Sequence, residues 1–381
     1  MFNVHPKNYE IEKLRAVAII YVILWHYSEM LLAVLGIDQR YYGTWTGVDL
    51  FFCISGYVIT KSLFASLGTE GIRDYLLGFY IKRVFRIWPS AFVCIGAALL
   101  VTFLCTKSMG LHFFYDTKKD ALPALLNYAN FAFFFKSENH GGTLLGIFWS
   151  LSLEEQFYLI IPIALWCFRR QLPAFMALLL VLALLQFIQH REPWKVLWWS
   201  IRTDGLIYGV LIAIIECRYN SFFQSVGRRI SSFRPVIVLG LLPALLITLG
   251  LIGSVYFQRY IQLQTSWAGV ISAILVFVAA LDQGLVLSGT LVSPVLIWIG
   301  SRSFGIYLFH NLVLVIIKAI NLSKFHVSFN LSSISYYLLV FVTIGCLGGL
   351  CELNYRLIEV PLRNLGRRIA GWHFSGTKEK S

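Results

Sequence analysis

The feature that most constrains this chain is its series of apolar runs, each long enough to cross the hydrocarbon core of a bilayer. A transmembrane helix needs about 20 mostly apolar residues. Only 13% of the 381 residues are charged, against about 25% in a typical soluble domain. We therefore predict an all-α, polytopic membrane helix bundle with about ten transmembrane helices. The candidate spans are residues 12–34, 46–66, 86–106, 147–168, 172–189, 197–216, 235–252, 266–282, 295–319 and 334–357.

The distribution of Lys and Arg predicts how the bundle is oriented. With the N-terminus in the cytoplasm, about two thirds of these residues fall on the cytoplasmic side, as the positive-inside rule requires. An even number of spans then places both termini in the cytoplasm. We divide the chain into a membrane-embedded domain, residues 1–362, and a basic cytoplasmic tail, residues 363–381.

The sequence speaks against several other classes of protein. The net charge of +13 is spread between apolar runs and forms no basic face with interleaved aromatic residues, so we expect no nucleic-acid partner. The seven Cys residues lack metal-ligand spacing, and we predict neither disulfides nor a metal site. No HExxH, CxxC, GxGxxG or P-loop motif occurs, and no Gly-x-Ser-x-Gly nucleophile elbow.

Two adjacent carboxylates, Glu154 and Glu155, interrupt the apolar run 147–168. A carboxylate at bilayer depth costs several kcal/mol unless it faces the bundle interior or a wet cavity, which makes this pair a candidate functional site. Ser150 and Glu154 share one helix face, while Glu155 points about 100° away. We therefore expect Glu154 to face the site and Glu155 to brace a neighbouring helix. The alternative is a buried pair with a structural role only.

Two histidines are predicted to lie at the same depth as Glu154. At a rise of about 1.5 Å per residue, His26, Glu154 and His310 all fall about 20 Å above the cytoplasmic side. Asp49, Arg202 and Asp204 lie somewhat higher, and Tyr307 is paired with His310 at i, i+3. His26 is suited to general acid–base chemistry. The alternative is that each is a core histidine hydrogen-bonded to a neighbouring helix.

Three arginines are expected near the cytoplasmic end of the same path. Arg15 lies within about 20° of the face of His26, because 11 residues are close to three helical turns. Arg83 and Arg86 share a face at i, i+3, an arrangement suited to a polyanion such as a nucleotide phosphate. The alternative is that all three are positive-inside anchors.

Taken together, these segments resemble the acyltransferase-3 family of polytopic membrane O-acyltransferases. The motifs that carry the resemblance occur in the family's order. Phe309 stands where a Trp is expected before His310, and the chain after Pro361 carries no SGNH-type domain. The pieces are Leu14-Arg15-Ala16-Val17-Ala18 with His26, Gly47–Tyr57, Arg83-x-x-Arg86-Ile87-Trp88-Pro89, Trp149–Tyr158, Arg202-x-Asp204-Gly205, Ser303–His310 and Glu359-x-Pro361.

The resemblance implies transfer of an acyl group, usually acetyl, from cytoplasmic acyl-CoA to a hydroxyl of a glycan or lipid-linked sugar. Members of the family act on the O-antigen of lipopolysaccharide, exopolysaccharide, peptidoglycan, Nod factors and macrolides. Acetyl-CoA is then a co-substrate rather than a resident cofactor, and handover to an SGNH partner would occur in trans. The implied location is the bacterial inner membrane, with both termini cytoplasmic. The oligomeric state stays open, a homodimer included.

Under this interpretation, His26 is the general base, assisted by Glu154 or Glu155. Acyl-CoA docks at Arg15, Arg83 and Arg86. Asp49, Ser150, Arg202, Asp204, Tyr307 and His310 bind the acceptor or support the site. Direct attack on the thioester and an acyl-histidine intermediate both remain open. A proton-coupled transporter or flippase that uses the same buried charges is the alternative function, and a non-catalytic scaffold in polysaccharide assembly is a third.

Overall fold

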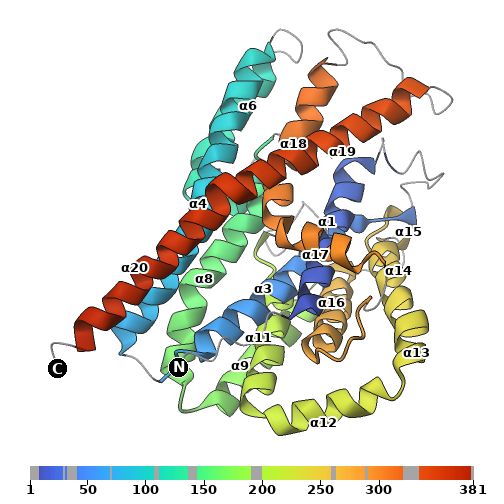
Figure 1. Cartoon of the computed structure of the whole chain (residues 1–381). Helices are drawn as coiled ribbons and strands as arrows, with labels where there is room; N and C mark the ends of the chain where they lie inside the picture. The colour runs from blue at the N-terminus through green and yellow to red at the C-terminus, as the bar shows by residue number, and fades with distance from the viewer. Residues whose placement is uncertain are drawn as a thin grey trace.

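The structure of the protein is a computed structural model, and the residues that it describes are mostly helical, with no strand among them. Its helices form one elongated bundle in which α6 lies at one end and α12 lies across the other (Figure 1). The described residues are 8–28, 31, 41–68, 71–106, 111–135, 144–189, 200–258, 263–287, 291–320 and 334–378.

The helices range from single turns to the 33 residues of α4. The first half contains α1 (Tyr9–His26), the 3-10 turn η2 (Thr44–Thr46), α3 (Gly47–Phe64), α4 (Ile72–Leu104), α6 (Leu111–Leu125), α7 (Ala129–Phe135), α8 (Phe148–Phe168) and α9 (Leu172–Phe187). The second half contains α11 (Asp204–Arg218), α12 (Asn220–Ser231), α13 (Arg234–Val236), the π-helical η3 (Ile237–Leu241), α14 (Leu242–Ile252), α15 (Val255–Gln258), α16 (Gln264–Ala280), α17 (Ser293–Ser301), α18 (Ser303–Ile320), α19 (Ile334–Asn354), the π-helical η5 (Tyr355–Glu359) and α20 (Val360–Lys378).

The protein is a helical membrane protein, and four to six of its described helical stretches could cross a membrane. Four described stretches are long and apolar enough to cross a membrane alone: Thr44–Phe64, Ile72–Leu104, Arg234–Ile252 and Tyr337–Gly371. Two bent pairs raise the number to six, namely α11 with α12 at 105° and α17 with α18 at 75°. The count of about ten is therefore not confirmed. The helices over two of the counted runs, α9 and α16, have only 16 and 17 residues.

The third predicted span also begins earlier than expected. The apolar run 86–106 is only the second part of α4, a 33-residue helix that starts at Ile72. At about 1.5 Å per residue this helix is about 50 Å long, well beyond a bilayer core of about 30 Å. Arg83 and Arg86 therefore lie in the middle of a continuous helix rather than at its first turn.

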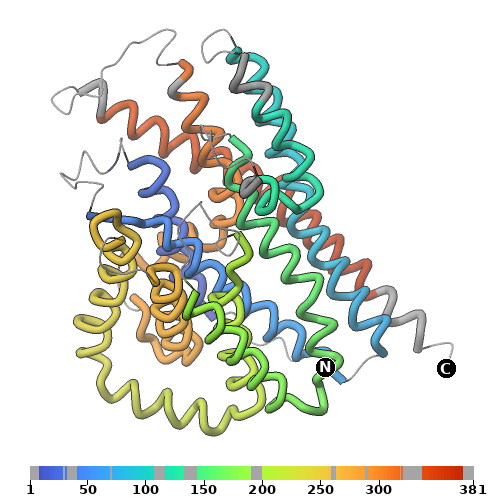
Figure 2. The backbone as a smooth tube through the Cα atoms, turned by 180° about the vertical axis from the view of Figure 1, so that it is seen from behind, coloured from blue at the N-terminus to red at the C-terminus, as the bar shows by residue number. Residues whose placement is uncertain are grey.

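The basic tail expected after residue 362 continues the last helix. The helices α19 and α20 are joined by η5 without a break, and α20 runs to Lys378. It packs along α4 over much of its length (Figures 1 and 2). Gly366 makes this close approach feasible, because a Cβ at this position would meet the Cβ of Phe85.

The helices α3 and α11 form the closest contact in the core. A side chain at Gly56 would collide with the backbone of Leu206, and one at Gly209 would collide with the backbone of Cys53. Gly205 also faces α3, at the carbonyl of Asp49. Small residues spaced by four allow two helix backbones to touch in this way. We call the contact of Gly56, Gly205 and Gly209 the α3–α11 contact.

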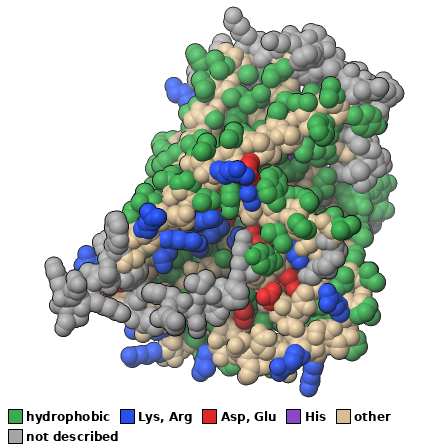
Figure 3. Space-filling model, in the orientation of Figure 1, with side chains coloured by type: hydrophobic (Ala, Val, Ile, Leu, Met, Phe, Trp, Pro, Cys, Tyr) green, Lys and Arg blue, Asp and Glu red, His purple; other side chains and the backbone are tan. Residues whose placement is uncertain are grey.

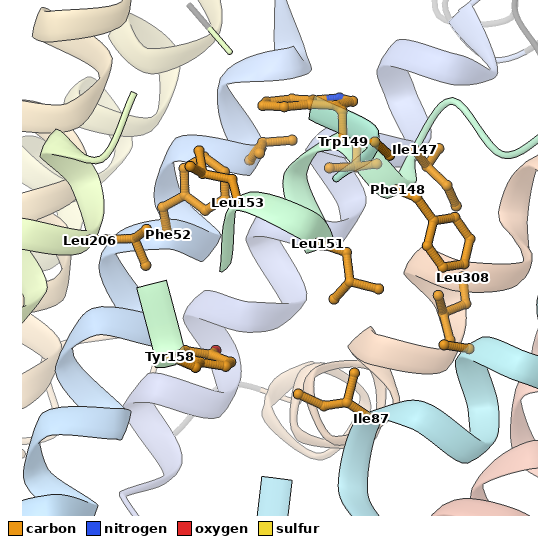
Figure 4. Close-up of a cluster of buried hydrophobic side chains, with 14 of the residues drawn as sticks. Phe52, Ile87, Ile147, Phe148, Trp149, Leu151, Leu153, Tyr158, Leu206 and Leu308 are labelled. Atoms are coloured by element: carbon orange, nitrogen blue, oxygen red, sulfur yellow. The ribbon is translucent and has the colours of Figure 1, made fainter. Parts of the chain in front are cut away.

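A cluster of buried apolar side chains centres on the first turns of α8. Figure 4 labels members from α3, α4, α8, α11 and α18 and shows them filling the space between α8 and its neighbours. The ring of Trp149 meets that of Phe52 edge-on, with 6.1 Å between centroids. This packing fixes the direction in which Ser150 and Glu154 point. The labelled members are Phe52, Ile87, Ile147, Phe148, Trp149, Leu151, Leu153, Tyr158, Leu206 and Leu308.

Candidate active site

A cavity of about 90 Å³ lies inside the bundle between α1, α3, α4, α8 and α18. Its wall contains charged and polar side chains from all five of these helices, although the surrounding chain is strongly apolar. These groups are Arg15, Ser55, Arg83, Arg86, Ser150, Glu154, Tyr158, Ser303 and Tyr307. We call this space the arginine cavity.

Three arginines converge on the arginine cavity from two helices. Arg15 of α1 is held by Glu12, with Nη1 3.2 Å from a carboxylate oxygen. Arg83 of α4 lies over the rings of Phe79 and Tyr158, at 5.5 and 5.4 Å. Arg86, one turn further along α4, lines the same space. The cavity therefore offers a concentration of positive charge that suits an anionic ligand.

The two adjacent glutamates of α8 have different surroundings. Glu154 lines the arginine cavity and accepts a hydrogen bond from the Tyr158 hydroxyl, one turn along the same helix. Glu155 instead accepts a hydrogen bond from Trp88 of α4. The helix geometry predicted this separation, with Glu154 facing the site and Glu155 against a neighbouring helix. The catalytic role of either residue stays a prediction.

Two histidines meet at the far end of α1. The ring of His26, the last residue of α1, lies 4.7 Å from the ring of His310 in α18. His310 is fully buried, whereas His26 is exposed. Nδ1 of His310 is 2.7 Å from the carbonyl oxygen of Tyr307, and the Tyr27 hydroxyl donates to the carbonyl of His310. We call His26 and His310 the histidine pair.

Tyr307 lies between the arginine cavity and the histidine pair. Its hydroxyl lines the cavity and is 2.5 Å from the hydroxyl of Ser150. Both hydroxyls also lie within hydrogen-bond distance of the carbonyl of Ile147. The Tyr307 ring is 5.7 Å from the ring of His310. One turn of α18 thus contacts both parts of the candidate site.

A buried ion pair lies next to this region. Nε of Arg202 is 3.4 Å from Asp49 of α3, and both side chains are 1% exposed. The guanidinium is also flanked by the rings of Trp45 and Trp149, at 5.2 and 5.1 Å. Asp204, at the first turn of α11, is buried beside Gly269 of α16.

The structure groups the predicted residues into three neighbouring sets. Glu154 and Ser150 join the three arginines in the arginine cavity, and the histidine pair forms the second set. Asp49 and Arg202 form the third. The nearest ring to His26 is that of His310, and among the described contacts none joins His26 to Glu154 or Glu155. The expected assistance of His26 by a carboxylate therefore stays a prediction.

Tyr158 was not among the predicted site residues, although its hydroxyl and ring contact Glu154 and Arg83. Its spacing of four from Glu154 could have revealed it, because residues at i and i+4 are neighbours on a helix surface. No group of three or more His, Cys, Asp or Glu side chains within the described ranges is arranged to hold a metal ion.

Comparison with known proteins identifies the family to which the chain belongs. A family model described as an acyltransferase domain matches residues 8–352. The chain belongs to this family, the acyltransferase-3 family of membrane proteins. No solved structure matches the chain.

Three similar proteins come from two bacterial species. The O-acetyltransferase OatA of Staphylococcus aureus is 25% identical over 93% of this chain. YrhL of Bacillus subtilis, provisionally named a peptidoglycan O-acetyltransferase, is 26% identical over 94% of it. A second S. aureus protein, provisionally named an O-acetyltransferase, is 25% identical over 96%. The chain covers only 57%, 55% and 59% of these relatives, respectively.

Proposed function

We propose that this protein is a membrane O-acetyltransferase that moves an acetyl group from cytoplasmic acyl-CoA to a hydroxyl of a glycan or lipid-linked sugar. The observation that carries the proposal is the arginine cavity, which lies inside the membrane bundle and is joined by Tyr307 to the histidine pair. Membership of the acyltransferase family and the names of the similar proteins support it. The bacterial inner membrane, with both termini cytoplasmic, is the proposed location.

The donor would bind with its anionic end at the arginines. Arg15, Arg83 and Arg86 are three cations in one cavity, against one carboxylate, Glu154. Guanidinium groups bind phosphate oxygens through paired, charge-assisted hydrogen bonds. Because α1 rises by about 1.5 Å per residue, its 11 residues from Arg15 to His26 cover about 16 Å. The pantetheine arm of CoA is long and flexible, and it would carry the thioester along this path.

His26 would act as the general base on the acceptor. His26 is an exposed residue that a hydroxyl could reach, and a proton would pass from that hydroxyl to a ring nitrogen. The oxygen then bonds to the thioester carbonyl carbon, and the C–S bond breaks. The CoA sulfur takes up the proton from His26 and leaves as the thiol. In the variant mechanism His26 first takes the acetyl group itself.

His310 would orient His26 rather than replace it. A carbonyl oxygen only accepts hydrogen bonds, so the contact with Tyr307 places the His310 proton on Nδ1 and leaves Nε2 as an acceptor. An imidazole with a fixed tautomer beside the base favours one orientation of the His26 ring. Asp49, Arg202 and Asp204 would support the acceptor side, and Ser150 and Tyr307 the path between the two parts.

The test is His26→Ala in purified protein supplied with radiolabelled acetyl-CoA and the glycan fraction of the host cell. We expect the release of CoA and the labelling of glycan to fall by at least about 1,000-fold, the upper part of the range for a lost acid–base group. The control is His112→Ala, which removes a histidine with no predicted role. Full activity of His26→Ala would refute the proposal. Movement of a saccharide across vesicles without loss of acetyl-CoA would favour the transporter.

A further inference from the structure

A second cavity, of about 220 Å³, opens between α3, α4 and α20. It shares Arg83 and Arg86 with the arginine cavity, so the two spaces adjoin at these side chains. Its lining contains five cations and no carboxylate: Lys82, Arg83, Arg86, Arg363 and Arg367. We call it the α20 cavity. Figure 3 shows basic side chains gathered where α20 crosses the molecule.

The neighbouring carboxylate, Glu359, compensates the positive charge of the α20 cavity only weakly. Arg363 has Glu359 one turn earlier, but Nη1 is 3.8 Å from the carboxylate, which is too long for a hydrogen bond. Nε of Arg363 is buried and has no hydrogen-bond partner. A buried donor without a partner is costly, so a ligand with several acceptor oxygens would be bound strongly here.

The position of these arginines is fixed by helix packing. Arg363 and Arg367 are one turn apart and share a face of α20. Gly366, beside them, allows α20 to close against Phe85 of α4. Because Phe85 lies directly before Arg86, this contact brings the α20 arginines next to those of α4. The result is a single basic surface built from two helices that are distant in the sequence.

We propose that the α20 cavity binds the phosphorylated nucleotide end of the acyl-CoA donor, with Arg363 and Arg367 as residues specific for its 3′-phosphate. This inference rests on the proposed function. The shared arginines, Arg83 and Arg86, then contact the diphosphate, and the acyl-bearing arm extends into the arginine cavity. A phosphate monoester carries close to two negative charges and three acceptor oxygens, which matches two adjacent guanidinium groups.

The experiment compares donors that differ only at the nucleotide end. The full chain carrying Arg363→Gln and Arg367→Gln together is assayed with acetyl-CoA, acetyl-dephospho-CoA and acetyl-pantetheine. We expect the KM for acetyl-CoA to rise at least about tenfold at unchanged kcat, since charge-assisted hydrogen bonds are lost. The KM for the other two donors should change less than about twofold. Arg368→Gln, which changes an exposed arginine of α20 outside the cavity, is the matched control.

Direct binding separates this inference from the proposed function. Calorimetry with CoA and dephospho-CoA should show a preference for CoA of at least about tenfold in the wild type, which disappears in the double variant. If the wild type binds neither compound, the proposed function fails. If it binds both equally, only the α20 assignment fails. A double lysine variant, Arg363→Lys with Arg367→Lys, should keep most of the preference for CoA. This result would show that α20 still packs against α4 when the two arginines are replaced.

An anionic lipid headgroup has similar chemistry and is tested in the same way. The calorimetry is repeated in nanodiscs of phosphatidylcholine alone and in nanodiscs that contain phosphatidylglycerol. A preference for CoA that is the same in both lipids supports the nucleotide. Equal affinity for CoA and dephospho-CoA in both lipids, with loss of bound phosphatidylglycerol in the double variant, would assign the cavity to lipid and overturn the inference.

Discussion

Arg202 and the pair Arg83 and Arg86 represent two ways of placing a guanidinium inside an apolar bundle. Arg202 has partners of its own: the Asp49 carboxylate at 3.4 Å and the rings of Trp45 and Trp149. Arg83 and Arg86 instead face two cavities, and cations outnumber carboxylates around them. The first arrangement has an opposite charge supplied by the protein itself, whereas the second leaves positive charge for a ligand.

The difference separates residues that hold the fold from residues that bind. A buried charge with all its partners supplied by the chain contributes chiefly to the specific structure. A charged side chain that lines a cavity can still form charge-assisted hydrogen bonds with a ligand that enters the cavity. A position inside the bundle, which both sites share, does not by itself make this distinction. The comparison is therefore tested by measuring stability and donor affinity separately at each site.

The largest effect is expected for Asp49→Ala. Removing this carboxylate leaves the Arg202 charge buried and without its ion pair, which costs about 3–5 kcal/mol of the free energy of unfolding. Unfolding in detergent with rising denaturant, followed by tryptophan fluorescence, gives the change. Asp116→Ala removes an exposed carboxylate that is 3.8 Å from Lys119. This control should cost less than about 1 kcal/mol. Equal losses at both positions would mean that the buried Asp49–Arg202 pair stabilises the protein no more than an exposed ion pair does.

A smaller effect of a different kind is expected for Arg86→Gln. The loss of charge-assisted hydrogen bonds to the donor should cost about 1.5–3 kcal/mol of binding, or a rise of about 10- to 100-fold in the KM for acetyl-CoA. The free energy of unfolding should stay within about 0.5 kcal/mol. Steady-state kinetics and the same denaturation series check the two halves of this prediction. A stability loss as large as that of Asp49→Ala would erase the distinction between the two sites.

The smallest overall effect, counting stability and binding together, is expected when both members of the Asp49 pair become apolar. Asp49→Leu combined with Arg202→Met removes the two charges together, so neither is left uncompensated. Such exchanges are often neutral, and we expect a change within about 1 kcal/mol. The double-mutant cycle with the two single variants measures the coupling. If the double variant is as unstable as Asp49→Ala, the pair contributes more to the free energy of unfolding than the cancellation of its two charges.

Local spacing predicted those features of the site that depend on a single helix. Ser150 and Glu154 share a face of α8, and both line the arginine cavity. Arg83 and Arg86 do the same on α4. In each case the helix period alone fixes which side chains point together. The membrane class followed equally from the apolar composition.

Features that depend on how distant helices pack could not be derived in this way. The contact of His26 with His310 joins α1 to α18, and depth alone gave only a common height. The start of α4 at Ile72 was missed because Arg73, Asp74 and Lys82 interrupt the apolar run without interrupting the helix. Arg363 and Arg367 were predicted to lie in a tail, because a charged stretch of sequence does not indicate which helix it packs against.

The α3–α11 contact has a consequence for how such a protein can change. Gly56 and Gly209 touch backbone directly, so even an alanine there pushes the two helices apart. Gly205 lies at the carbonyl of Asp49, and Arg202 lies just before α11. A library of random substitutions should therefore recover almost nothing at these glycines, while the exposed apolar positions of α9 accept many residues. Under the proposed function, new acceptor specificity would therefore have to arise from substitutions in the surrounding loops, because the α3–α11 contact tolerates almost none.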